Sequence, residues 1–242
     1  MPDMDATAQI PSAAACDAAP LLALGDASYA VRDYRSFEFV SFEVKAGQVA
    51  VAAAHEHAPV RDLLLCAAGL VRPSLGTVCV EGRALKYGPF GRRAAAGLGA
   101  FSGVADADMH LTVEEALRRE LGPAASEDAV LAHLADWRIA THADRRLERL
   151  EPLARAYFSV CLAAAVPASV AVADLADPFC RGLTVEEARE VATRARELAC
   201  RDASCFVFGV SDPAAFDAAD VAIPLDTAAE DACRALASQE VC

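Results

Sequence analysis

Three short apolar stretches of the sequence constrain its fold more than any other feature: "QVAVAAA" at 48–54, "ASVAVADLA" at 168–176 and "SCFVFGV" at 204–210. Apolar runs of this length that do not alternate are typical of strands buried on both faces. The chain between and around them contains amphipathic segments long enough for helices, such as "EDAVLAHLADW" and "EEAREVATRARELACR". Short apolar strands separated by helices predict a parallel sheet that is covered on both faces.

Other segments carry signals for a strand or for a helix start. Residues 37–44, "FEFVSFEV", alternate in polarity, which predicts a half-buried strand. Residues 59–70, "PVRDLLLCAAGL", predict a helix with Pro59 in its first turn, where a missing N–H costs nothing. The stretch "LTVEEA" occurs at 111 and at 183, and each copy fits a capping box. We therefore interpret the two copies as helix starts and not as a domain repeat.

The composition excludes several classes of function. With 242 residues, of which 55% are hydrophobic, the chain can bury a full core and is not intrinsically disordered. Its 22 Lys and Arg against 35 Asp and Glu give a net charge of -13, which argues against a broad basic face for nucleic acid or anionic lipid. We expect a protein partner and no nucleic acid.

The cysteines and the apolar runs predict a cellular location. None of the nine cysteines forms a C-x-x-C pair, and most lie in apolar runs, as reduced thiols of a cytosolic protein do. No uncharged apolar run reaches the roughly 18 residues of a membrane span, and the first residues lack the basic and apolar regions of a signal peptide. We expect a chain that is neither exported nor membrane-spanning.

The order and spacing of five segments resemble the ATPase subunits of ABC transporters across about residues 20–226. The segments are "FVSFEVKAGQVAVAA", "LLLCAAGLVRPSLGTVCVEGRAL", "LTVEEALRREL", "SVAVADLADPFCRGLT" and "CFVFGVSDPAAFDAADVAIPLD". The resemblance implies a P-loop-NTPase-like α/β fold with a mostly parallel core sheet, N-terminal antiparallel strands and a helical subdomain at about 105–165. The expected divisions are a flexible tail at 1–20, an ABC ATPase-like domain at 21–226 and a C-terminal extension at 227–242.

Compared with this family, the phosphate-binding loop of the chain lacks the groups that bind phosphate and Mg²⁺. In the family this loop reads G-x-x-x-x-G-K-[ST], and its N–H groups and lysine hold the phosphates while its hydroxyl binds Mg²⁺. The corresponding positions here hold Ala54, His57, Pro59, Val60, Arg61 and Asp62. Val60 stands at the lysine position, and Pro59 has no N–H to donate. Arg61 stands at the hydroxyl position, and because a guanidinium also binds phosphate, partial compensation by Arg61 stays open.

Other positions that contact the nucleotide in the family are substituted as well. The signature L-S-G-G-Q, which clasps the γ-phosphate bound to the partner subunit, is replaced by "LEPLA" at 150–154. Ser102 stands nearest to the position of the glutamine that senses Mg²⁺, and Ser211 aligns with the histidine that touches the γ-phosphate.

The second acidic strand allows two alignments. If Asp174 takes the position of the Mg²⁺ carboxylate, Leu175 takes that of the catalytic glutamate. If Asp177 takes the place of the glutamate, Ala176 takes that of the Mg²⁺ carboxylate. Neither alignment keeps both carboxylates, so we name no catalytic residue.

His55 and His57 flank Glu56 and suggest a metal site at first. Two histidines at i and i+2 with no third ligand nearby are more typical of a solvated loop. We therefore expect no metal there.

Taken with these substitutions, the resemblance implies a catalytically degenerate nucleotide-binding subunit that binds ATP at most weakly. Its expected partners are an ABC permease and a second ABC ATPase subunit, which would place it in the cytoplasm, peripheral on the inner face of the cell membrane. The permease is expected to contact the segment "FSGVADADMHLTVEEAL" at 101–117. Two alternatives stay open: an active ABC ATPase with atypical ligands such as Arg61 and Asp174, and a free-standing regulatory or scaffold protein derived from one.

Overall fold

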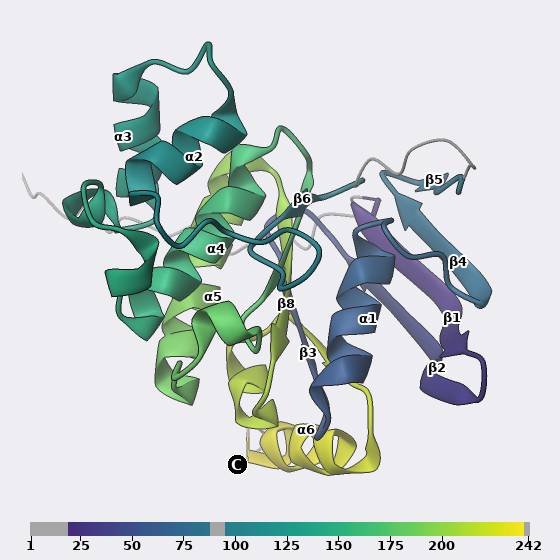
Figure 1. Ribbon diagram of the computed structural model, residues 1–242. Coiled ribbons are helices and arrows are strands. Elements are labelled where there is room, and N and C mark those ends of the chain that lie inside the picture. Colours follow the sequence, from purple (N-terminus) through teal and green to yellow (C-terminus); the bar gives the residue numbers. More distant parts are fainter. Residues whose placement is uncertain (1–18, 88–94, 240–242) are drawn as a thin grey trace, which may run out of the picture.

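The computed structural model describes residues 19–87 and 95–239, which form two sheets and a set of helices (Figure 1). The antiparallel sheet has the strand order β2-β1-β4-β5, and the second sheet has the order β6-β7-β8-β3-β9 with every neighbouring pair parallel. The strands are β1 (Leu22–Val31), β2 (Tyr34–Val44), β3 (Val49–Ala53), β4 (Leu75–Val80), β5 (Arg83–Ala84), β6 (Gly97–Leu98), β7 (Val170–Asp174), β8 (Cys205–Val210) and β9 (Val221–Pro224). The expected fold class, with a parallel core and N-terminal antiparallel strands, is confirmed.

The parallel sheet is buried on both faces, as the apolar runs predict. Along β3, Val49, Val51 and Ala53 belong to the hydrophobic core that includes the side chains of α4 and α5. The alternate residues Ala50 and Ala52 belong to a second core, formed with α1 and the antiparallel sheet. Because neighbouring side chains of a strand point to opposite faces, a strand between two cores must be apolar throughout.

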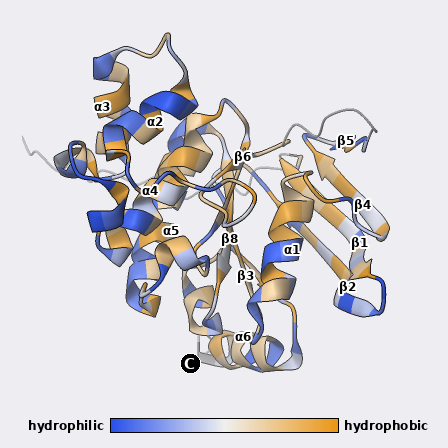
Figure 2. Ribbon diagram, viewed as in Figure 1, coloured by the Kyte–Doolittle hydropathy of each residue, from blue (hydrophilic) through white to orange (hydrophobic). Residues whose placement is uncertain are grey.

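The helices cover the parallel sheet in two layers. In Figure 1, α1 lies between the two sheets, whereas α4 and α5 lie on the other side of the parallel sheet. Figure 2 shows that hydrophobic residues dominate α1 along the stretch enclosed by the two sheets. The helices are α1 (His57–Ala67), α2 (Val113–Leu121), α3 (Glu127–Asp136), α4 (Pro152–Ala165), α5 (Val185–Asp202) and α6 (Thr227–Gln239).

Both predicted capping boxes are present. At the start of α2, the Thr112 hydroxyl accepts a hydrogen bond from Glu115 N, and Glu115 Oε2 accepts one from Thr112 N at 2.9 Å. The same exchange joins Thr184 and Glu187 at the start of α5. Each box satisfies two N–H groups that a helix start otherwise leaves without an intrahelical partner.

The structure shifts the start of one predicted helix. The helix predicted over 59–70 begins earlier, at His57, although Pro59 still lies in its first turn. Most of the predicted tail, residues 1–18, lies outside the described residues, and within the expected C-terminal extension the structure adds α6, which packs against β9. The proposed domain boundaries themselves remain predictions.

The described cysteines form no disulfide with one another. All seven are free, and Cys66, Cys161, Cys180 and Cys205 are buried in the cores. Burial raises the pKa of the Cys66 thiol to about 12, so it packs as a small neutral hydrophobe. Over the described ranges, no helix combines the length and the apolar character needed to cross a membrane.

Candidate functional site

The candidate site lies where β3 and β7 end and α1 begins. Parallel strands present their carboxyl ends at one edge of a sheet, and ligands of open α/β folds bind at that edge. Here β3 ends at Ala53, β7 ends at Asp174, and α1 starts at His57. The sheet topology thus brings together positions that are far apart in the sequence.

The connection from β3 to α1 is short and contains no glycine. Only Ala54, His55 and Glu56 lie between the strand and the helix, and Glu56 caps the helix in an extended conformation without a side-chain hydrogen bond. Val60 is fully buried, and one of its methyl groups would lie 2.7 Å from a Cβ added to Gly209 of β8. The side chain at the expected lysine position therefore packs into the core.

His57 and Asp174 form a hydrogen-bonded pair across the site. His57 Nε2 lies 2.7 Å from Asp174 Oδ2, and the Asp174 side chain is fully buried. The hydrogen bond to Asp174 raises the pKa of His57, while burial opposes that shift. Burial also raises the pKa of Asp174, and this effect outweighs the hydrogen bond from His57 that lowers it. The pair holds a proton at the place where β7 ends.

A second set of hydrogen bonds joins Arg61, Ser102 and Asp177. Arg61 Nη2 donates to the carbonyl oxygen of Ser102 at 2.8 Å. Ser102 donates to Asp177 twice, from Oγ at 2.7 Å and from its backbone N–H at 2.8 Å. The Asp177 carboxylate, which is 1% exposed, also accepts from Phe179 N at 2.8 Å. We call the His57–Asp174 pair together with the Arg61–Ser102–Asp177 set the α1 latch, because both attach α1 to neighbouring segments.

The remaining candidate residues lie outside the α1 latch. Asp62 Oδ2 accepts a hydrogen bond from Ser36 Oγ of β2 at 2.8 Å, so it attaches α1 to the antiparallel sheet. Ala54 is buried directly after β3, and Pro59 is half-buried on α1. Ser211 is exposed directly after β8. The structure therefore brings five of the candidates together, namely His57, Arg61, Ser102, Asp174 and Asp177.

One sequence prediction at this site is wrong. His57 was expected in a solvated loop together with His55, but it is the first residue of α1, half-buried and bonded to Asp174. The signal that identifies this pair is topological: each residue lies at or just beyond the carboxyl end of a parallel strand. In the part of the chain that the structure describes, no group of three His, Cys, Asp or Glu side chains is arranged to hold a metal ion.

A groove of about 810 Å³ lies beside the candidate site. Its described lining includes Leu98 of β6 and Phe158 and Leu162 of α4, together with residues of the loop before α2 and of α2 itself. The loop also reaches the α1 latch, because Gly103 N, next to Ser102, donates to Asp106 Oδ1 at 2.8 Å. The segment from Ser102 to Asp106 therefore connects the latch to the groove.

No protein-family model matches the sequence, and no curated protein matches it. Solved structures do match. A nucleotide-free ATP-binding cassette from an ABC transporter is 14% identical, with a TM-score of 0.64 over 86% of this chain and 88% of that one. The cbiO1 protein from Clostridium perfringens, part of the ABC transporter complex cbiONQ, is 13% identical, with a TM-score of 0.63 over 86% of this chain and 85% of that one.

A third match is an ATP-binding cassette in a dimeric post-hydrolysis state with bound ADP and Pi. It is 14% identical, with a TM-score of 0.64 over 85% of this chain and 94% of that one. At this level of identity the likeness concerns the fold. The chain has the fold of the ATP-binding cassettes of ABC transporters.

Proposed function

We propose that the chain is a catalytically degenerate nucleotide-binding subunit of an ABC transporter, which retains a structural or coupling role and has lost ATP hydrolysis. The observation that carries this proposal is the His57–Asp174 pair. It occupies the edge of the sheet where a phosphate and its Mg²⁺ would require free donors and a free carboxylate.

The local packing supports the same conclusion. A phosphate loop needs backbone N–H groups that point at the ligand and a positive side chain beside them. The turn after β3 has no glycine, Pro59 offers no N–H, and Val60 is packed against Gly209. Arg61 would have to release the Ser102 carbonyl before it could bind phosphate. These residues do not fit a bound MgATP, so we derive no catalytic step through it.

The end of β7 favours one of the two alignments of the acidic strand. Because the strand ends at Asp174, this residue is the better match to the Mg²⁺ carboxylate, and Leu175, 4% exposed, then stands at the position of the catalytic glutamate. A buried leucine cannot activate water. The proposal therefore includes no general base on this strand.

The chain would fulfil its structural or coupling role through contacts with other subunits. We propose an ABC permease and a second ABC ATPase subunit as partners, with the groove beside residues 101–117 as the contact with the permease. The segment from Ser102 to Asp106 would then connect that contact to the α1 latch. In this assembly the chain would lie on the inner face of the cell membrane.

Calorimetric titration with MgATP tests the loss of tight nucleotide binding, and a phosphate-release assay tests the loss of ATP hydrolysis. We expect no turnover and, at most, weak binding that does not need Mg²⁺. Micromolar MgATP affinity that disappears in Arg61→Ala but persists in Arg72→Ala, an exposed arginine outside the site, would refute the proposal. Purification from native membranes tests the partners, and a preparation without any permease or second ATPase subunit would count against them.

A further inference from the structure

Another groove, of about 540 Å³, lies on the antiparallel sheet, away from the candidate site. Its lining comes from the loop after α1, from β4 and from the segment that contains β5, and it includes Arg72, Leu75, Thr77, Ala84 and Lys86. We call it the β4–β5 groove. In Figure 1, β4 and β5 lie on the far side of α1 from α4 and α5. The Leu75 side chain is 60% exposed, so the groove opens to solvent.

The β4–β5 groove is a basic region of an acidic chain. Residues 72–87 carry Arg72, Arg83 and Lys86 against one carboxylate, Glu81, whereas the whole chain has 35 Asp and Glu against 22 Lys and Arg. All three cations are exposed. Among the described residues, none of them forms an ion pair with an Asp or Glu side chain. Their charge is therefore available to an anionic group that enters the groove.

The N-terminal segment of the chain, residues 1–18, has a composition that complements this groove. It contains Asp3, Asp5 and Asp17 and no Lys or Arg. Most of its other residues are small or apolar, such as the run "PSAAAC". Such a segment can place carboxylates next to the cations and small side chains next to the apolar part of the lining.

This segment also enters the described structure close to the groove. Leu21 O accepts a hydrogen bond from Glu81 N at 2.8 Å, and Leu22 pairs with Val80 at the end of β4. From Val80 the groove extends back along β4 to Leu75, which is about 17 Å at about 3.3 Å per residue. A segment of 18 residues spans up to about 60 Å when extended, so its aspartates can reach the cations.

We propose that residues 1–18 bind in the β4–β5 groove of the same chain, with their aspartates next to Arg72, Arg83 and Lys86. Exposed ion pairs each contribute modestly, but several of them can hold a segment whose covalent attachment raises its effective concentration. The bound segment would also cover β5, the end strand of the antiparallel sheet, where an exposed edge otherwise invites pairing with another chain. The inference does not depend on the proposed function, because the groove lies away from the candidate site.

Photo-crosslinking within the full chain tests this contact. The photoreactive residue p-benzoylphenylalanine replaces Ala8, the dilute protein is irradiated, and the products are mapped by mass spectrometry. Residues 81–83 lie beside the point where the segment enters and would react with it in any case, so only products at residues 72–78 are counted. Most of the other intramolecular products are expected there, and their yield should fall at about 0.5 M salt because salt screens the ion pairs.

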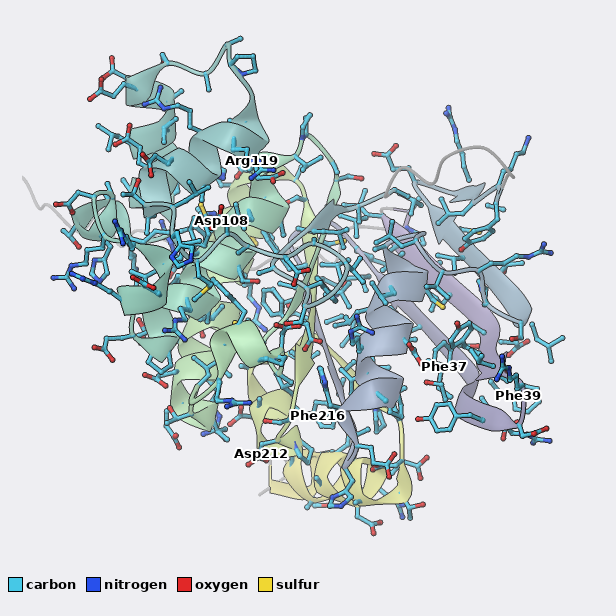
Figure 3. All side chains as sticks on the ribbon, in the orientation of Figure 1. Phe37, Phe39, Asp108, Arg119, Asp212 and Phe216 are labelled. Atoms are coloured by element: carbon cyan, nitrogen blue, oxygen red, sulfur yellow. The ribbon has the colours of Figure 1, made fainter. Side chains whose placement is uncertain are left out.

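Charge reversals assign the contact to the groove. Arg72→Glu with Lys86→Glu should lower the yield at residues 72–78 by at least about threefold, because both cations then repel the aspartates. Arg119→Glu with Arg149→Glu, the same change at two exposed arginines elsewhere, should leave the yield unchanged. Figure 3 shows Arg119 on α2, away from the antiparallel sheet. Circular dichroism verifies that each variant is folded.

A charge swap separates binding from a general disturbance of the groove. Asp3→Lys with Asp5→Lys should lower the yield at residues 72–78, and combining it with Arg72→Glu and Lys86→Glu should restore the yield. Products spread over the whole surface, a yield that the groove reversals leave unchanged, or a swap that restores nothing would overturn the inference. Products that mainly join two copies of the chain would also overturn it, because they would place the segment on a second molecule.

Discussion

His57 lies within the stretch that corresponds to the family's phosphate loop, and its side chain, which can be charged, has a buried carboxylate as its partner. The imidazole faces Asp174 and, at longer range, Asp177 and the Arg61 guanidinium. The two carboxylates favour the charged ring, whereas burial and Arg61 oppose it. Because the hydrogen bond to Asp174 is the largest influence, the folded chain holds the His57 proton more tightly than the unfolded chain does.

The tighter hold on this proton predicts that the free energy of unfolding falls as pH rises. The pKa of His57 is raised from its ordinary value of 6.5, so its contribution is fully present below 6.5 and is lost as pH rises through the folded value. The pKa of Asp174 is also raised and acts in the same direction, so a variant must separate the two. Gln at position 57 still donates an N–H but does not titrate.

The measurement is urea denaturation at about pH 6 and about pH 8.5, on either side of the ordinary histidine pKa. The unfolding free energy of the unsubstituted chain should be lower at the higher pH than at the lower pH. This decrease should be smaller in His57→Gln. His110→Gln, at an exposed histidine outside the latch, should retain it. An identical decrease in His57→Gln and in the unsubstituted chain would show that the pair does not contribute.

Asp177 gives a second prediction about a single residue. Its carboxylate accepts three hydrogen bonds, two from Ser102 and one from Phe179 N, and it is nearly fully buried. Asp177→Ala leaves these donors without an acceptor and should lower the unfolding free energy by about 2–3 kcal/mol. Asp106→Ala, which removes one exposed acceptor, should cost well under about 1 kcal/mol, and equal costs in urea denaturation would contradict this assignment.

Among the elements, the contact between β6 and α4 leaves no room for a side chain. A Cβ added to Gly97 would lie 1.8 Å from the carbonyl oxygen of Ala163, which is backbone and cannot rotate away. Gly97→Ala must therefore push α4 away from the sheet, and we expect it to cost about 3 kcal/mol or more. Gly25→Ala, whose Cβ would be 3.3 Å from the Thr77 hydroxyl, is the matched control. Thermal melts that show equal losses would contradict the close approach.

The sequence predicts elements whose signals are local and misses features that depend on tertiary contacts. The capping boxes at Thr112 and Thr184 are complete within four residues, and the apolar run of β3 reports burial on both faces. The hydrogen bond of His57 joins it to Asp174, which is 117 positions away, so no local pattern indicates it. No local pattern indicates the role of Gly97 either, because this role depends on its close approach to the backbone of Ala163.

At the scale of the whole molecule, the α1 latch joins three parts of the chain: α1, the end of β7 and the segment that contains Ser102. His57 and Arg61 are on α1, Asp174 ends β7, and Ser102 precedes the loop that lines the groove. These hydrogen bonds connect α1 and the end of β7 to the segment that leads to the groove. This agrees with a subunit that transmits or supports a conformational change without turnover of its own.

Rebuilding the phosphate loop should therefore not create an ATPase. The combined change Ala54→Gly, Pro59→Gly, Val60→Lys and Arg61→Ser restores the family's loop motif but removes the hydrogen bond that Arg61 contributes to the latch. It also places a lysine where Val60 packs against Gly209, so thermal unfolding should occur at a lower temperature than in the unsubstituted chain.

No phosphate release above background is expected from this variant. Groups that act as a catalytic unit lose most of their effect when several members are missing. The loop change leaves Leu175 at the favoured glutamate position, Ser211 at the histidine position and "LEPLA" at the signature. Adding Leu175→Glu supplies one more member and should still give no turnover, because the signature and the histidine are absent. Measurable phosphate release from either variant would mean that the substitutions at the signature and at the histidine position do not prevent catalysis.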